Sequence, residues 1–200
     1  SSGDPCFSCS RFCYSKTFGR SPYIWRLTRF RGHITDSVCI KSYIRNGKSA
    51  GRVVGAGTIT KSIDVKDAIN AGANFAVSPG STDDILETCA QQNLPILPGA
   101  ATSTEIMRLF DLGYSVQKFF PAEAIGGQAT LKAIGGPLPN VKFCPTGGIT
   151  INNAKGYLEL ENTLCVGGSW VAPQHLIENK DWKSITCLLY TSDAADDRLS

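Results

Sequence analysis

Residues 116–121, VQKFFP, place one lysine inside an apolar run that ends at a proline. Such a run, bounded by turn residues, predicts a short buried strand. Because side chains alternate between the faces of a strand, Lys118 and Phe120 should share one face, with Phe119 on the other. An ammonium group among apolar neighbours is poorly solvated, which favours the neutral amine. A neutral amine can attack a ketone and form a Schiff base, although a lysine at a strand end can also extend to water.

On both sides of this stretch, from Arg45 onward, strand and helix patterns alternate at intervals of roughly 20 residues, which is typical of repeated βα units. Strands are expected over residues 53–58, 75–78, 95–98, 116–120, 141–144 and 163–166. Helices are expected over residues 63–71, 83–91, 102–112, 128–134, 152–160 and 181–185. Capping signals predict the starts of two of these helices, at Ser81 or Thr82 and at Thr102 or Ser103.

The first 44 residues differ from the rest in charge and cysteine content. They carry seven Lys/Arg against two Asp/Glu and four of the eight cysteines, whereas residues 45–186 carry twelve of each charge. The basic character therefore belongs to this segment alone, and we expect no nucleic-acid partner. Its aromatic residues show no helix or strand periodicity. A zinc site could use Cys6, Cys9 and Cys13 with Cys39 or His33, but the spacing is irregular.

A shifted reading frame accounts better for this segment. With a shift of one base, codons for residues 4–11 can encode Ile-Pro-Val-Leu-Val-Val-Val-Asp, and codons for residues 31–36 can encode Glu-Val-Thr-Leu-Arg-Thr. The first product has the composition of a buried parallel strand, and the second reads as a strand that carries an acid and a base. Together with the six strands above they make eight, the number in a (β/α)8 TIM barrel. We therefore interpret residues 1–44 as an out-of-frame translation, which replaces the first two βα units of the barrel.

The other end of the chain also departs from the pattern. Residues 187–200 resemble translated sequencing-adaptor DNA, so we expect the folded domain to span residues 45–186. No stretch is apolar for long enough to span a membrane, and residues 1–20 have no apolar core of signal-peptide type. These features predict a cytoplasmic protein without a membrane partner.

Polar and glycine-rich residues follow most of the predicted strands. In barrels of this kind the functional groups lie at the C-terminal ends of the strands. Two glycine pairs, Gly147-Gly148 and Gly167-Gly168, follow the last two strands. Bare backbone N–H groups can approach an anion closely, so these pairs favour a phosphate site.

These motifs together resemble one family, the bacterial 2-keto-3-deoxy-6-phosphogluconate / 4-hydroxy-2-oxoglutarate (KDPG/KHG) aldolases. The matching segments within residues 45–186 are VGAGT at 54–58, FAVSPG at 75–80, KFFPAE at 118–123, FCPTGGI at 143–149 and CVGGSW at 165–170. The resemblance implies that Lys118 forms the Schiff base. It implies contacts to the pyruvate half of the substrate from Thr58, Pro79, Phe120 and Thr146. It implies contacts to the phosphate from Gly147, Gly148, Gly168 and Ser169.

The resemblance also implies the activity. A class I aldolase of this family would cleave KDPG, a phosphorylated keto acid of the Entner–Doudoroff pathway, to pyruvate and glyceraldehyde 3-phosphate, and KHG to pyruvate and glyoxylate. It would be a homotrimer and would need no metal or other cofactor. The family's general acid/base and its substrate-binding arginine belong to a Glu-Val-Thr-Leu-Arg-Thr strand, which only the shifted frame encodes. Glu123 is the nearest in-frame carboxylate, and we expect it to be a loop or helix-start residue.

Two other interpretations remain open from the residues. One is a different phosphate-binding barrel enzyme, such as a phosphosugar isomerase or a thiamin-phosphate-synthase-like protein, in which Lys118 acts only as a charge. The other is a phosphate-binding fragment without catalysis. Cys144 and Cys165 are expected in the core, and His175 on the surface.

Overall fold

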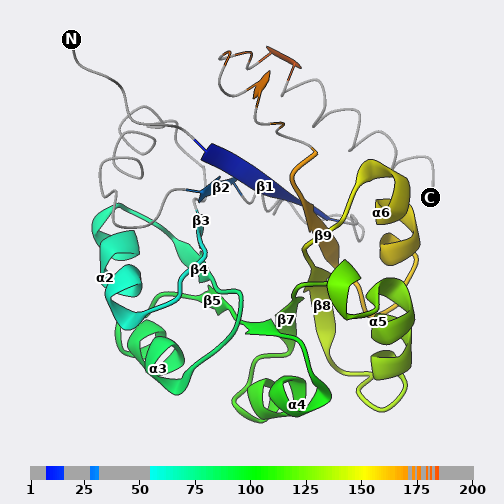
Figure 1. The fold of residues 1–200 in the computed structure, drawn as a ribbon. Helices are drawn as coiled ribbons and strands as arrows, with labels where there is room; N and C mark the ends of the chain where they lie inside the picture. The colour runs from blue at the N-terminus through cyan, green and yellow to red at the C-terminus, as the bar shows by residue number, and fades with distance from the viewer. Residues whose placement is uncertain are drawn as a thin grey trace, which may run out of the picture.

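The computed structural model describes residues 8–15, 28–31 and 55–170, and seven single residues between 173 and 184. Figure 1 shows strands that follow one another around a ring, with helices on its outside. In chain order the elements are β1 (Ser8–Ser15), β2 (Thr28–Arg31), β3 (Gly55–Gly57), α2 (Ser62–Asn70), β4 (Phe75–Val77), α3 (Asp83–Gln91), β5 (Ile96–Leu97), β6 (Gly99–Ala100), α4 (Ser103–Asp111), β7 (Val116–Phe119), the 3-10 helix η1 (Glu123–Ile125), α5 (Gly127–Gly135), β8 (Lys142–Pro145), α6 (Ile151–Leu158) and β9 (Cys165–Gly168).

The strands from β3 onward run parallel. β3, β4 and β5 form one parallel sheet, and β6, β7 and β8 form a second. Parallel bridges from Phe143 to Thr163 and from Thr146 to Gly167 join β8 to the β9 segment. Helices alternate with these strands along the chain, so the predicted βα units are confirmed over residues 55–168.

Helices α2 to α6 begin and end within two residues of their predicted bounds. Two of the starts rest on side-chain caps, because the hydroxyl of Thr82 accepts from the Ile85 N–H and that of Thr102 from the Glu105 N–H. Glu105 completes a capping box by accepting from the Thr102 N–H, and it also accepts from the Ala101 N–H. The backbone hydrogen bond from Ala101 lowers the pKa of the Glu105 carboxyl.

The predicted strand over residues 95–98 differs from the structure in an informative way. The structure has two short strands on either side of Pro98: β5, which pairs with β4, and β6, which lies beyond the predicted bounds and pairs with β7. Proline has no N–H to give to a sheet ladder, which interrupts the pairing at this point. Its carbonyl still accepts from the Lys118 N–H at 2.8 Å, so this stretch links the two parallel sheets.

The core lies between the strands and the outer helices. Phe119 of β7 and Phe143 of β8 are fully buried there, with ring centroids 6.0 Å apart, and they pack with Leu109 of α4 and Leu131 of α5. Gln117 faces the same layer, where its amide donates to carbonyls of α4 and the turn that follows. The predicted alternation of β7 is therefore confirmed, because Phe119 and Gln117 point to the helices.

Part of residues 1–44 forms strands, although their side chains show no strand periodicity. β1 pairs antiparallel with β9, and β2 pairs antiparallel with β1 (Figure 1). A free strand edge offers backbone N–H and C=O groups to any extended chain, so side-chain periodicity is not required for pairing. β1 therefore runs opposite to β9, whereas a strand supplied there by the restored frame would run parallel to it. The frame-shift hypothesis itself stays a prediction.

Among the residues that the structure describes, no helix has the length and apolar character needed to cross a membrane.

Candidate active site

Lys118 is the third residue of β7 and has only 3% of its surface exposed. Its Nζ atom lies 4.6 Å from the centroid of the Phe120 ring. Its register partners are Gly99 on β6 and Cys144 on β8, so glycine leaves space beside the lysine on one side. Burial favours a neutral amine, while the ring face favours a cation on the same nitrogen.

The loops after β7 and β8 are joined by backbone hydrogen bonds. The Ala122 N–H donates to the Thr146 carbonyl at 2.9 Å, and the Glu123 N–H to the Gly147 carbonyl at 3.1 Å. The Phe120–Pro121 peptide bond is cis. A Cβ at Gly147 would lie 3.2 Å from the Phe120 ring, so this ring extends from the lysine to the glycine turn.

The turn after β8 requires its two glycines. Gly147 and Gly148 have φ values of 104° and 77°, a region that side chains disfavour. Thr146 is 5% exposed, and its hydroxyl would meet any side chain placed at Gly167 of β9. This packing brings Thr146 and both predicted phosphate loops to the same end of the strands.

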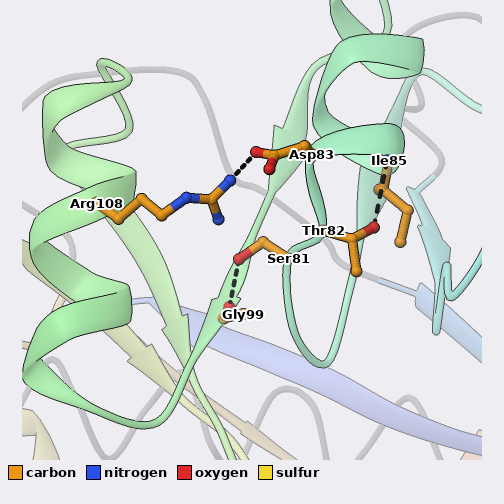
Figure 2. Close-up of polar contacts among 6 residues, drawn as sticks. All are labelled: Ser81, Thr82, Asp83, Ile85, Gly99 and Arg108. Atoms are coloured by element: carbon orange, nitrogen blue, oxygen red, sulfur yellow. Dashed lines mark hydrogen bonds and ion pairs between the residues drawn. The ribbon is translucent and has the colours of Figure 1, made fainter.

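The loop after β4 reaches the lysine strand through Gly99. A methyl group on Gly99 would overlap the backbone of Pro79 and Gly80, so only glycine lets this loop come so close. The Ser81 hydroxyl donates to the Gly99 carbonyl at 2.8 Å and fixes the approach, as Figure 2 shows. Because Gly99 pairs with Lys118, Pro79 lies within one strand of the amine.

Figure 2 also shows which of the two predicted residues, Ser81 or Thr82, caps α3. Thr82 is the N-cap of α3, whereas Ser81 points away from the helix toward Gly99. Arg108 of α4 forms an ion pair with Asp83 at the start of α3. Both side chains of this ion pair are well exposed, so the pair lies at the protein surface.

Thr58 follows β3 and has a φ of 61°. A β-branched residue in this left-handed region is uncommon and costs on the order of 1–3 kcal/mol, and such residues cluster at functional sites. The Ile59 N–H donates to the Val77 carbonyl, which ties this position to the end of β4. Thr58 and Pro79 therefore lie on neighbouring parallel strands, at the same end as Lys118.

The β9 end of the site meets the N-terminal sheet. Gly167 and Gly168 pair in register with Cys13 and Phe12 of β1. Ser169 follows directly and is exposed. Of the residues predicted to contact phosphate, Gly148 and Ser169 are thus exposed, Gly147 is partly buried and Gly168 is buried.

Glu123 is the first residue of η1, as expected for a helix-start residue. Its Oε1 atom accepts a hydrogen bond from the hydroxyl of Tyr157 on α6. Burial, then the hydrogen bond and the charge of Glu123, raise the pKa of the Tyr157 hydroxyl above its ordinary value. The carboxylate is therefore directed at α6.

The other candidates lie in or near the core, on the surface, or outside the described residues, and Cys144 among them is the β8 partner of Lys118. Cys144 is buried, Cys165 is partly buried, and His175 is exposed. The zinc candidates Cys6, His33 and Cys39 and the tail at 187–200 lie outside the described residues. Of the helix predicted over 181–185 the structure describes three residues, among which Ser184 donates to the carboxylate of Asp181.

Comparison with known proteins extends this geometry. Residues 34–188 match the aldolase family described as KDPG and KHG aldolase. The chain belongs to this family. It is 48% identical over 134 residues to the 2-dehydro-3-deoxy-phosphogluconate aldolase of Pseudoalteromonas atlantica, which covers 67% of this chain and 62% of that protein. It is 45% identical over 136 residues to the KHG/KDPG aldolase of Escherichia coli K12, covering 68% and 64% of the two chains. The chain thus spans less than two thirds of these relatives.

Solved structures agree with this assignment. The KDPG aldolase of Legionella pneumophila, with pyruvate captured as a covalent carbinolamine intermediate, superposes with a TM-score of 0.73 at 41% identity, covering 80% of this chain and 76% of that one. A KDPG aldolase of Zymomonas mobilis with 3-phosphoglycerate gives a TM-score of 0.63 at 44% identity, covering 68% and 64%. The parallel strands and outer helices therefore belong to a TIM-barrel-like α/β fold.

Sequence reasoning missed three contributors to the site: Ser81, Gly99 and Tyr157. The strand predicted over residues 95–98 ends just before Gly99, but nothing in the sequence showed that Gly99 would pack on Pro79. Tyr157 lies within a helix pattern and reads as a core residue, which it also is. Ser81 and Gly99 are 18 positions apart in the sequence, and Glu123 and Tyr157 are 34 positions apart, so no local sequence pattern indicates these contacts.

Proposed function

We propose that this chain is a class I aldolase of the KDPG/KHG type, in which Lys118 forms a Schiff base with the keto group of the substrate. The observation that carries this proposal is the burial of Lys118 on a parallel strand, with its amine against the Phe120 ring. Burial supplies a neutral nucleophile. The same ring face would stabilise the iminium cation that forms on Nζ.

The reaction follows from ordinary imine chemistry. Nζ adds to the C2 carbonyl to give a carbinolamine, and loss of water leaves a protonated imine. When the C4 hydroxyl loses its proton, the C3–C4 bond breaks and an aldehyde leaves. The electron pair of the C3–C4 bond moves toward the protonated imine, which becomes an enamine. Protonation at C3 and hydrolysis then release pyruvate and regenerate Lys118.

Proton transfer requires an acid/base group near C4. The family resemblance assigns it to the glutamate of the Glu-Val-Thr-Leu-Arg-Thr strand, which only the shifted frame encodes. We therefore assign residues 1–44 to an out-of-frame segment, residues 45–186 to the barrel and residues 187–200 to an adaptor-derived tail. On this interpretation the chain as written forms the imine but cleaves poorly.

The remaining substrate contacts are assigned to residues at the C-terminal ends of the strands. Thr58, Pro79 and Thr146 would contact the pyruvate half of the substrate, with Phe120 beside them. Gly147, Gly148, Gly168 and Ser169 would hold the phosphate of KDPG, and KHG would leave that subsite empty. The positive φ of both glycines in the β8 turn supports an anion-binding role. As further proposals, the repaired enzyme is a cytoplasmic homotrimer of the Entner–Doudoroff pathway.

The experiment is reductive trapping. The full chain is treated with pyruvate and borohydride, and Lys118→Ala serves as the matched control. A stable pyruvate adduct, located at Lys118 by peptide mass spectrometry and absent from the control, is expected. A folded chain without an adduct would instead favour the phosphate-binding interpretations, in which Lys118 acts only as a charge.

A further inference from the structure

A hydrogen bond between Glu123 and Tyr157 joins the loop after β7 to α6, and it lies next to the start of α5. Glu123 follows the cis proline that ends the β7 loop, and Tyr157 comes from α6, the helix that begins just after the β8 turn. The Tyr157 hydroxyl donates to Glu123 Oε1. A Cβ at Gly127 would lie 2.9 Å from the Tyr157 hydroxyl and 3.1 Å from Glu123 Oε1, so this hydrogen bond passes directly over Gly127.

The stem of Glu123 also lies on the glycine turn. A Cβ at Gly148 would lie 2.6 Å from Glu123 Cβ and 2.7 Å from Cγ. Gly148 is held from the other side by α6, because the Asn153 amide donates to its carbonyl at 3.2 Å. The exposed Gly148 is thus contacted by a side chain of the β7 loop and bonded to the first turn of α6.

Breaking the hydrogen bond between Glu123 and Tyr157 would have two unfavourable consequences. Tyr157 is fully buried and has a single polar atom, so the loss of its partner would leave a buried hydroxyl unsatisfied. Glu123 carries a negative charge close to the turn that the proposed function assigns to phosphate. Glu123 Cγ lies 2.7 Å from the position of a Cβ built on Gly148, so a carboxylate released from Tyr157 would remain near this turn and would repel an anion there.

We propose that Glu123 and Tyr157 are a positioning pair that fixes the Gly147–Gly148 turn relative to the lysine strand and holds the Glu123 carboxylate away from the bound phosphate. The proposal rests on the proposed function, because it concerns the phosphate end of that site. The pair would set the preference for substrates that carry a phosphate group, while leaving imine formation at Lys118 unaffected.

The test uses the full chain and two readouts. Binding of inorganic phosphate is measured by calorimetry, and pyruvate is titrated in the borohydride trapping assay. Tyr157→Phe, which removes only the donor, is expected to weaken phosphate binding about tenfold. It should change the pyruvate concentration for half-maximal trapping by less than about twofold, because the Lys118 strand keeps its own contacts.

Two further variants separate positioning from general loosening. Glu123→Gln keeps an oxygen acceptor for Tyr157 without the charge, and should retain phosphate binding within about twofold. Tyr114→Phe, at the opposite end of β7, is the matched control and should change neither readout. The chain's urea unfolding midpoint is recorded for each variant.

Each outcome decides the proposal. Unchanged phosphate binding in Tyr157→Phe, equal losses for phosphate and pyruvate, or an equal loss in Tyr114→Phe would overturn it. A chain that binds no phosphate would overturn it as well, since there would be no site to position. A chain that binds phosphate but forms no pyruvate adduct would instead refute the proposed function, and the phosphate readout would still decide the pair.

Discussion

The strands β3 to β9 and the strands β1 and β2 are built on different principles. In the first region the strands run parallel and helices alternate with them, so their C-terminal ends gather at one edge. In the second, β1 and β2 run antiparallel, and β1 pairs with the edge of β9. Backbone pairing alone can fill a place beside β9. Parallel order, in contrast, gathers the C-terminal ends of the strands at the candidate site.

The difference shows what a barrel needs for chemistry. Lys118, Thr146 and Pro79 come together because each lies near the C-terminal end of a parallel strand. An antiparallel strand beside β9 presents its other end to the site, so we do not expect its residues to take the places that the family resemblance assigns to the glutamate and arginine of the shifted frame. A strand can therefore pair with the edge of β9 without supplying side chains to the candidate site.

The largest expected effect comes from exchanging the second region. Replacing residues 1–44 with the strands of the shifted frame should raise the rate of pyruvate release from KDPG by about 10²–10⁴-fold, the usual contribution of general acid–base catalysis. The repaired protein should also be more monodisperse, because a parallel strand pair would close the free edges. Both versions are compared by size-exclusion chromatography and a pyruvate assay. Equal activity would leave Glu123 as the first candidate for proton transfer.

Within the parallel region, Gly99→Ala tests the close approach of the β4 loop. The added methyl would overlap the Pro79 backbone, so we expect a loss of about 1–3 kcal/mol in the free energy of unfolding and weaker pyruvate trapping. Gly80→Ala is the matched control, since nothing lies within 4 Å of its added methyl. Urea unfolding and trapping are measured for both. If the two variants behave alike, the Gly99 contact does not position the loop.

Much of the parallel region could be predicted because its signals are local. Caps such as Thr82 and Thr102 and the alternation around Lys118 depend on a few neighbouring residues. The division of one strand at Pro98 required knowledge of its partners on both sides, and the pairing of β1 depended on a free edge. Neither is visible in a local pattern. The site was predictable where residues follow strands, and not where a distant side chain such as Tyr157 holds them in place.

At the boundary between the regions, Ser169→Asp tests the phosphate end. The introduced carboxylate should repel the phosphate dianion and raise the KM for KDPG by about tenfold, with little change for unphosphorylated KHG. Ser169→Asn is the matched control, because it has a similar shape and no charge. The measurement uses the frame-restored protein with both substrates. Equal losses for the two substrates would place the phosphate elsewhere.

The smallest effect is expected at the outer surface, for the ion pair between Arg108 and Asp83 (Figure 2). Its side chains are 43% and 72% exposed, so solvent screens their attraction, and the pair should contribute less than about 1 kcal/mol. Asp83 also lies in the first turn of α3, where a negative charge interacts favourably with the helix dipole. Asp83→Asn alone would lose both terms.

A double-mutant cycle separates these two terms. Arg108→Gln, Asp83→Asn and the double variant are unfolded in urea, and the coupling free energy isolates the ion pair from the helix-dipole term. We expect a coupling below about 1 kcal/mol that shrinks further in about 1 M salt, where the Debye length is about 3 Å. Pyruvate trapping should remain unchanged in all three variants, because Ser81 and Gly99 hold the loop from inside. A coupling above about 2 kcal/mol, or a loss of trapping, would show that the outer ion pair helps to hold the Pro79 loop and that the contacts at Gly99 do not suffice.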